Sequence, residues 1–132
     1  MPLESFRISS PLPASAARIY SAWLDAREHA RMTGGAATVD PRVGGLFSAW
    51  DGYIAGAILE LEPGQRIVQS WRTTEFSDDD DDSQIEVLLE PAENATKLTI
   101  RHTNVPDGHR SYENGGWQSN YFDPMREYFG SL

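Results

Sequence analysis

The feature that most limits how this chain can fold is an aromatic helix at the end of a sequence that otherwise predicts strands. Between residues 111 and 129, Trp117, Tyr121 and Met125 recur every four positions. This spacing places three large apolar side chains on one face of a helix. Because most of the preceding sequence has strand character, the aromatic face is expected to lie on a sheet. A curved sheet that holds one helix often leaves a space between the two, and that space is where we look for a function.

The strand-like segments are separated by short turns, which predicts an antiparallel sheet because parallel pairs need long crossover connections. Asp51-Gly52 is a strong hairpin sequence, and Gly56 inside a strand indicates a bulge or the close approach of another element. The expected strands cover residues 4–10, 36–39, 46–50, 53–61, 66–76, 84–90 and 97–105.

Two short helices are expected between the first and second strands. Residues 14–24 carry an apolar helical face, and Asp25 with Glu28 forms a capping-box pattern that starts a second helix through about Arg31. Pro124 lies inside the C-terminal helix and is expected to kink or loosen it, because proline lacks the backbone donor of a regular helix.

Length and composition fit a single domain over residues 1–132 and disfavour several classes of partner. The chain has 20 acidic and 11 basic residues and a formal charge of −9, which disfavours binding to nucleic acid or an anionic membrane surface. It has no cysteine, so disulfides, thiolate metal sites and cysteine nucleophiles are excluded. Neither a signal peptide nor an apolar run of about 18 residues is present, so a cytoplasmic location is expected.

Several short motifs follow one another in a particular order along the chain. In sequence order they are Asp40–Phe47 with R-x-G-G-x-F, Asp51–Gly56 with D-G-x-x-x-G, Glu60–Pro63 before Ile67-Val68 and Trp71-Arg72, Leu98-Thr99 before Asn104-Val105-Pro106, and Gly116-Trp117-Gln118 before Tyr121-Phe122.

With these motifs, residues 10 to 130 resemble the START-like (SRPBCC) helix-grip superfamily. The resemblance is strongest to the C-terminal-type domain of the activator of 90-kDa heat shock protein ATPase family. It implies an α+β fold in which a curved antiparallel sheet of six or seven strands surrounds a long C-terminal helix, with two short helices in addition. It also implies a cavity between the sheet and that helix.

No metal or cofactor is expected from the remaining motifs. Gly44-Gly45 lacks the spacing of a phosphate-binding loop and fits a tight turn. The acidic run Asp78–Asp82 lacks the alternating ligands of a calcium loop and fits a solvated loop. The three histidines include no pair with metal-ligand spacing such as H-x-x-x-H.

Two of the expected strands carry polar residues that face inward, and the role of these residues has two interpretations. His102 alternates with Leu98 and Ile100, and it is either a core histidine with a hydrogen-bond partner or part of a binding site. Gln69 and Thr73 share the face of Trp71, where buried polar groups require partners from the protein, from water or from a ligand.

We therefore predict a non-catalytic module that binds a small hydrophobic or aromatic molecule between the sheet and the C-terminal helix. Apolar walls would supply affinity, while Gln69, Thr73 and His102 would orient the ligand through hydrogen bonds. The residues predicted to line the site are Trp23, Phe47, Trp50, Ile58, Gln69, Trp71, Thr73, Ile85, Val87, Ile100, His102, Trp117, Tyr121 and Met125.

Two other hypotheses stay open. One is a stand-alone protein-interaction module related to the activators of the 90-kDa heat shock chaperone. The other is an enzyme of the cyclase or hydrolase kind, which requires an inward-facing acid or histidine with a shifted pKa. Only His102 meets that requirement, because Lys97, Glu86 and Glu90 are expected on the outer face, and no catalytic residue is predicted.

Overall fold

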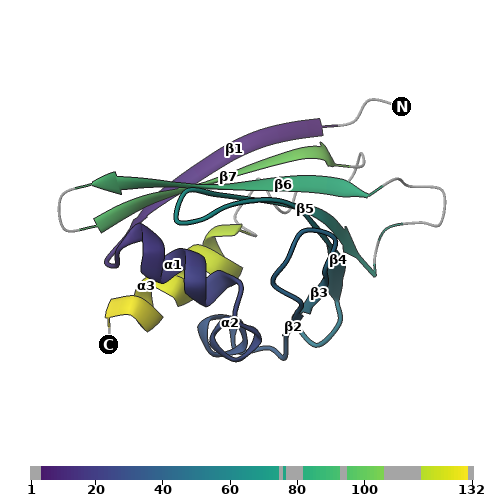
Figure 1. Cartoon of the computed structure of the whole chain (residues 1–132), viewed down its shortest axis with the longest axis horizontal. Helices are drawn as coiled ribbons and strands as arrows, with labels where there is room; N and C mark the ends of the chain where they lie inside the picture. Colours follow the sequence, from purple (N-terminus) through teal and green to yellow (C-terminus); the bar gives the residue numbers. More distant parts are fainter. Residues whose placement is uncertain (1–3, 75, 77–81, 93–94, 106–116, 131–132) are drawn as a thin grey trace.

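Seven antiparallel strands form one curved sheet, and the described helices lie on its concave side (Figure 1). The computed structural model describes residues 4–74, 76, 82–92, 95–105 and 117–130. The strand order across the sheet is β1-β7-β6-β5-β4-β3-β2. The strands are β1 (Glu4–Leu12), β2 (Thr38–Val39), β3 (Leu46–Ala49), β4 (Ile54–Glu62), β5 (Arg66–Thr73), β6 (Ser83–Ala92) and β7 (Ala95–Val105).

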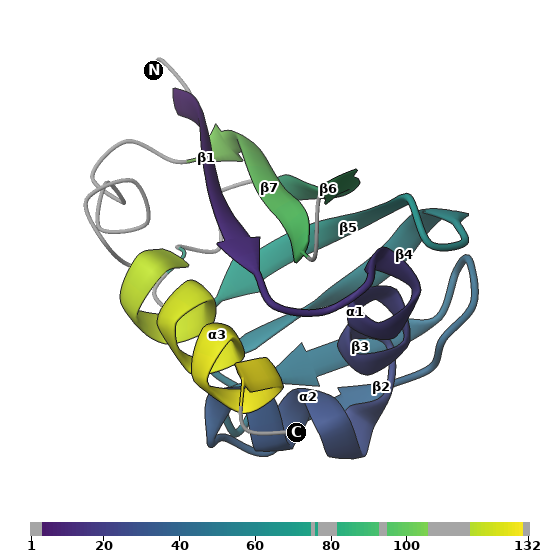
Figure 2. The ribbon, with the colours of Figure 1, turned by 90° about the vertical axis from the view of Figure 1, so that its left-hand side faces the viewer.

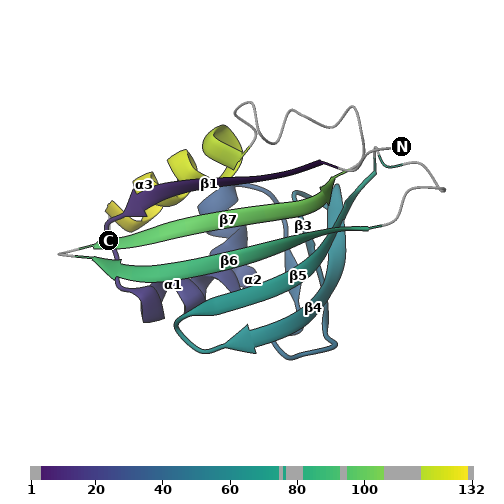
Figure 3. The same ribbon diagram turned by 90° about the horizontal axis from the view of Figure 1, so that it is seen from above.

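The helical layer consists of α1 (Ala16–Trp23), α2 (Ala26–Thr33), the π-helical turn η2 (Gln118–Phe122) and α3 (Asp123–Gly130). Figure 2 shows α3 crossing in front of the sheet with α1 and α2 beside it. Figure 3, seen from above, shows all the helices behind the strands. This arrangement confirms the predicted helix-grip architecture.

Strand alternation places the predicted apolar face toward the helices. On β5, the buried residues include Ile67, Gln69, Trp71 and Thr73. Most of the residues that alternate with them, including Arg66, are partly exposed. The strands pair in register with their neighbours, so that Ile67 lies opposite Val87 of β6 and Leu61 of β4. The core is therefore built from the concave face of the sheet and the helices that cover it.

Gly56 of β4 has no room for a side chain. A Cβ at this position would lie 2.1 Å from the carbonyl oxygen of Ser70 on β5 and 2.9 Å from the Phe47 ring on β3. The expected close approach of another element is thus confirmed, and a register shift follows in the same strand between Ile58 and Glu60. Glycine is needed here because its neighbours occupy the space that any other residue would fill.

The second helix begins as predicted, but the side chains of Asp25 and Glu28 bind different partners. Asp25 accepts a hydrogen bond from the backbone N–H of Glu28 at 3.0 Å. The Glu28 side chain instead binds Arg18 of α1 at 2.8 Å and Tyr128 of α3 at 2.8 Å. The Arg18 guanidinium is the main cause of a lowered pKa of the Glu28 carboxyl. Glu28 therefore joins all three α-helices, and α2 extends to Thr33 rather than ending at about Arg31.

The C-terminal helix changes its form just before Pro124. Residues Gln118–Phe122 form a π-helical turn, and the regular helix starts at Asp123. A proline near the start of a helix is tolerated because the first backbone donors have no intrahelical partner. The predicted disturbance of the helix is therefore present as a π-helical turn on the N-terminal side of Pro124.

Parts of the predicted organisation fall outside the described residues. These are the start of the C-terminal helix before Trp117, His109, and the acidic run except for Asp82, which binds Arg72 at 3.1 Å. Within the segments that are described, no helix has the length and apolar character needed to cross a membrane.

Candidate functional site

An aromatic cluster occupies the space between the centre of the sheet and the C-terminal helix. The Trp71 ring of β5 lies 5.0 Å from the Trp117 ring, 5.7 Å from Phe47 and 6.2 Å from Tyr121, measured between ring centroids. Tyr121 also lies 5.2 Å from Trp23 of α1. Aromatic pairs at these separations stabilise a core beyond their buried area. The predicted contact between the aromatic helix face and the sheet is thus present.

The predicted site residues come together in this region, and all but one are buried. Trp50 is the exception, because it is only partly buried at the edge of the core. The fully or almost fully buried members are Trp23, Phe47, Ile58, Gln69, Trp71, Thr73, Ile85, Val87, Ile100, His102, Trp117, Tyr121 and Met125. Whether they contact a ligand stays a prediction.

His102 is held by two side chains in a chain of hydrogen bonds. Ser83 donates its hydroxyl proton to the Trp71 carbonyl oxygen at 2.7 Å, so it accepts the Nε2–H of His102 at 2.8 Å. The His102 Nδ1 accepts the indole N–H of Trp117 at 3.3 Å. These directions require a neutral imidazole with its proton on Nε2. Burial accordingly lowers the pKa of His102 to about 3.

A second buried network joins the helices to the sheet. The Nδ1–H of His29 donates to the Trp23 carbonyl oxygen at 2.9 Å, and Nε2 accepts the Tyr121 hydroxyl proton at 2.9 Å. The Trp23 indole N–H donates to the Gln69 side-chain oxygen at 2.8 Å. Burial lowers the pKa of His29, although the hydrogen bond to Trp23 acts in the opposite direction.

The two networks change the expected roles of the polar residues. Gln69 and His102 were expected to orient a ligand, but each is already bonded to another side chain of the protein. His29 and Ser83 were not predicted to belong to this region. The sequence could have indicated them indirectly, because a buried Tyr121 hydroxyl and a buried His102 ring each require a polar partner.

Among the described residues, two buried indole N–H groups have no hydrogen-bond acceptor. They belong to Trp71, which is 1% exposed, and to Trp50, which follows β3. Ala49, next to Trp50, pairs with Ile54, and Ile54 pairs with Thr73 on β5 near Trp71. Trp50 and Trp71 therefore lie toward the same end of the sheet. Leaving a buried donor unpaired costs about 1–3 kcal/mol, so these positions are candidates for contact with an acceptor.

Few of the described side chains near the aromatic cluster are suited to metal binding or acid–base chemistry. Among the described residues, no group of three or more His, Asp or Glu side chains is placed to hold a metal ion. Lys97 and Glu90 lie on the outer face, as predicted, with more than half of each side chain exposed. Glu86 also lies on the outer face, where it binds Arg66 and is held 3.6 Å from Arg101.

The chain is similar to known proteins over almost its entire length. The solved structure of an HSP90 activator from Plasmodium falciparum superposes with a TM-score of 0.86 and 29% identity over 96% of both chains. The activator of 90 kDa heat shock protein ATPase homolog of Dictyostelium discoideum is 24% identical over 127 residues, which are 96% of this chain and 33% of that protein. An uncharacterized Schizosaccharomyces pombe protein is 29% identical over 117 residues, 89% of this chain and 34% of that protein.

The chain thus spans about one third of the length of the curated relatives that it matches. A family model described as Activator of Hsp90 ATPase homolog 1-like protein matches residues 13–130, which include every described helix and every described strand except β1. With the helix-grip fold and this match in agreement, the chain belongs to the family of Activator of Hsp90 ATPase homolog 1-like proteins.

Proposed function

We propose that this domain is a non-catalytic module that binds a small molecule at the aromatic cluster between β5 and the η2–α3 segment, with the cluster opening to admit it. The ligand would combine an apolar or aromatic body with a hydrogen-bond acceptor such as a carbonyl or carboxylate oxygen. The single observation that carries this proposal is the buried Trp71 indole N–H, which has no acceptor within the described part of the chain.

The surroundings of Trp71 favour this class of ligand. Its ring lies between those of Phe47 and Trp117, which supply apolar contacts to an aromatic molecule. The second unpaired donor, on Trp50, lies at the more exposed edge of the cluster. Two donors without acceptors match a ligand that accepts hydrogen bonds and does not need to donate them.

The enzyme hypothesis receives less support from the same geometry. Both ring nitrogens of His102 are engaged, one with Ser83 and one with Trp117. With its pKa lowered to about 3, His102 is a poor proton acceptor near neutral pH.

The ligand proposal predicts saturable binding of apolar acceptors that depends on the Trp71 N–H. Titration with 8-anilinonaphthalene-1-sulfonate and a panel of aromatic ketones should change tryptophan fluorescence in a saturable way. Trp71→Phe keeps an aromatic ring but removes the donor, so the dissociation constant of the best probe should rise by roughly tenfold.

Tyr128→Phe is the matched control for this experiment, because it removes a donor that is already bonded to Glu28 and that lies outside the predicted site. This variant is expected to lose stability but to keep its affinity for the probe within about a factor of two to three. The proposal is wrong if no probe binds saturably, or if Trp71→Phe binds as tightly as the unaltered protein.

A second candidate function is an interaction with a 90-kDa heat shock chaperone. It is favoured by the similarity to the Plasmodium falciparum HSP90 activator over 96% of both chains. The surface offers a patch that fits a protein partner, because Val43, Leu46 and Leu59 are 61%, 71% and 41% exposed. Leu46 pairs across the strands with Ala57, and Gly44 bonds to Ile58, so the three apolar side chains lie near one another. Exposed apolar groups that gather in this way often mark interaction sites.

The chaperone function predicts that the protein raises the ATP turnover of a 90-kDa heat shock chaperone. Leu46→Lys should weaken this stimulation at least several-fold, because it places a charge in the apolar patch. Thr38→Lys, at a neighbouring exposed strand position, is the control for the added charge. Unchanged turnover at saturating protein concentration would dismiss this function without affecting the ligand proposal.

A further inference from the structure

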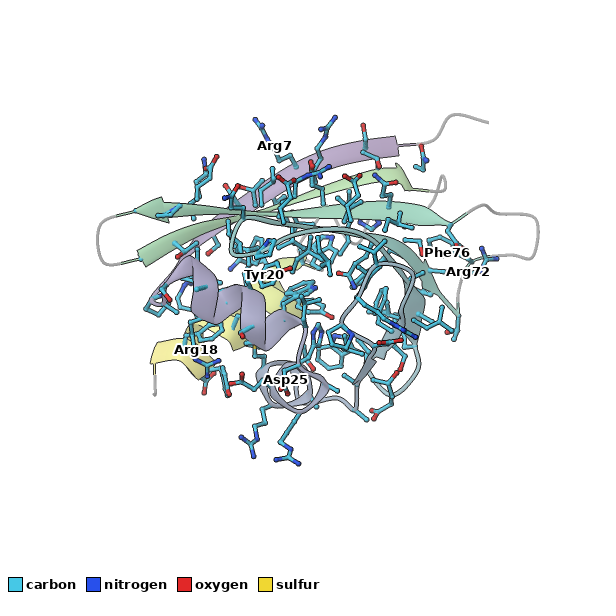
Figure 4. All side chains as sticks on the ribbon, in the orientation of Figure 1. Arg7, Arg18, Tyr20, Asp25, Arg72 and Phe76 are labelled. Carbon is cyan, nitrogen blue, oxygen red and sulfur yellow. The ribbon has the colours of Figure 1, made fainter. Side chains whose placement is uncertain are left out.

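A hollow of about 400 Å³ lies on the outer face of the sheet, away from the aromatic cluster. It is lined by Ser5 and Arg7 of β1, Leu88 of β6, and Arg101 and Thr103 of β7. Figure 4 shows Arg7 on the side of the sheet that faces away from the helices. The hollow is thus separate from the regions considered for a small apolar ligand and for a chaperone.

Two positive charges occupy directly opposed positions in this hollow. Arg7 of β1 pairs with Arg101 of β7 in the antiparallel ladder. Side chains opposite each other in such a ladder are close neighbours, and like charges there destabilise the pair. A bound anion between the two guanidinium groups would remove this repulsion.

A single acidic residue offsets part of the charge of this pair. The only acid in contact with Arg101 among the described residues is Glu86, at 3.6 Å, and Glu86 also binds Arg66. Arg7 is exposed and forms no ion pair within the described part of the chain. The described side chains that line the hollow therefore carry two positive charges and no negative one, on a protein with a formal charge of −9.

The remaining lining residues fit a small oxyanion that has an organic substituent. The Ser5 hydroxyl can donate one hydrogen bond, the Thr103 hydroxyl can exchange its long bond of 3.5 Å to the Gln84 carbonyl oxygen for one to a ligand, and the Leu88 side chain offers an apolar contact. Guanidinium groups bind phosphate in a bidentate manner and form stronger hydrogen bonds with ionised acceptors than with neutral ones. An extended polyanion such as nucleic acid would be repelled by the rest of the acidic protein.

We propose that this outer-face hollow binds the phosphoryl group of a phosphate monoester between Arg7 and Arg101. Ser5 and Thr103 donate hydrogen bonds to the remaining phosphoryl oxygens, and Leu88 contacts the substituent. The phosphoryl group is carried either by a small molecule or by a phosphorylated side chain of a protein partner.

The test is an NMR titration of the whole protein at low ionic strength, where surface electrostatic interactions are least screened. The three phosphate-containing probes are inorganic phosphate, phenyl phosphate and a phosphoserine hexapeptide. The unphosphorylated form of the hexapeptide is the control. The backbone amide signals of Arg7, Arg101 and Thr103 should shift saturably with at least one phosphorylated probe and stay unchanged with the unphosphorylated peptide.

Two variants show whether the binding is local. Arg7→Ala should raise the dissociation constant by roughly tenfold, as expected for the loss of one charge-assisted hydrogen bond. Arg27→Ala is the matched control, because Arg27 is an exposed arginine of α2 in the helical layer, on the opposite side of the sheet. It should change affinity by less than about twofold, since its charge lies in the helical layer, far from the hollow.

The outcome also identifies the source of the phosphoryl group. Tighter binding of phenyl phosphate than of the phosphopeptide indicates a small molecule, and the reverse order indicates a phosphorylated partner. The proposal is overturned if none of the three phosphorylated probes binds saturably. It is also overturned if Arg27→Ala weakens binding as much as Arg7→Ala does, since the attraction would then be a general effect of charge.

Discussion

Replacing Trp117 by alanine is expected to lower the free energy of unfolding by about 3–5 kcal/mol, the range for removing a large buried aromatic side chain. Trp117 is 1% exposed and lies 5.0 Å from the ring of Trp71 and 5.1 Å from that of Tyr121. The substitution removes these contacts and leaves a space that rigid neighbours cannot fill completely. Urea denaturation at neutral pH, followed by circular dichroism, measures the effect.

The variant Trp117→Phe separates ring packing from hydrogen bonding. It retains an aromatic ring but removes the indole N–H that binds His102 Nδ1. A loss of about 1–3 kcal/mol is therefore expected, smaller than that of the alanine variant. If Trp117→Ala lowered the free energy of unfolding by less than about 1 kcal/mol, the ring could not be packed against the sheet as described.

A loss of stability at Trp117 does not by itself demonstrate ligand binding, because the same face of the helix builds the core. The two roles separate at Trp71. Its ring packs against Phe47 and Trp117, whereas its N–H has no acceptor. Trp71→Phe changes mainly the second property, and for this reason it is the informative substitution for the proposed function.

The fold could be predicted because local patterns of the sequence determine its main features. The four-residue spacing of Trp117, Tyr121 and Met125 placed all three on one buried face. The alternation of Ile67 through Thr73 determined which side of β5 faces the helices. Periodicity of this kind depends on neighbours in the sequence, and a single buried face leaves few alternatives for the strand register.

The pairing of the buried polar groups could not be predicted in this way. Gln69 binds Trp23 across 46 positions of sequence, and Tyr121 binds His29 across 92 positions. Alternation indicated that Gln69 and His102 face inward, but it did not show whether the protein or a ligand supplies their partners. That distinction depends on distances between elements, which local sequence patterns do not contain.

The outer-face hollow depends on strand register in the same way. Arg7 and Arg101 are ordinary exposed arginines in the sequence, and only the pairing of β1 with β7 places them opposite each other. The first and last strands of the chain are neighbours in the sheet because the helices and the five intervening strands lead the chain back to β1.

Acidification from pH 7 to pH 5 is expected to destabilise the protein through its two buried histidines. In the unfolded chain a histidine gains a proton near pH 6.5, whereas burial lowers the pKa of His102 to about 3 and also lowers that of His29. Between these values the unfolded state binds more protons, so stability falls as the pH falls below about 6.5. Each histidine that stays neutral in the folded state contributes up to about 1.4 kcal/mol per pH unit.

Burial is the cause of the lowered pKa of His102, and the hydrogen bonds of the ring also oppose protonation. A proton on Nδ1 would face the indole N–H of Trp117, and two donors would then oppose each other. Urea denaturation at a series of pH values should give a free energy of unfolding that is steady above pH 7 and declines toward pH 5. In the folded protein, NMR signals of the His102 ring should not titrate over this interval, whereas in Trp117→Phe the pKa of His102 should rise because the opposing donor is gone. A His102 ring that titrated near pH 6.5 in the unaltered folded protein would show that the imidazole is neither buried nor bonded in this way.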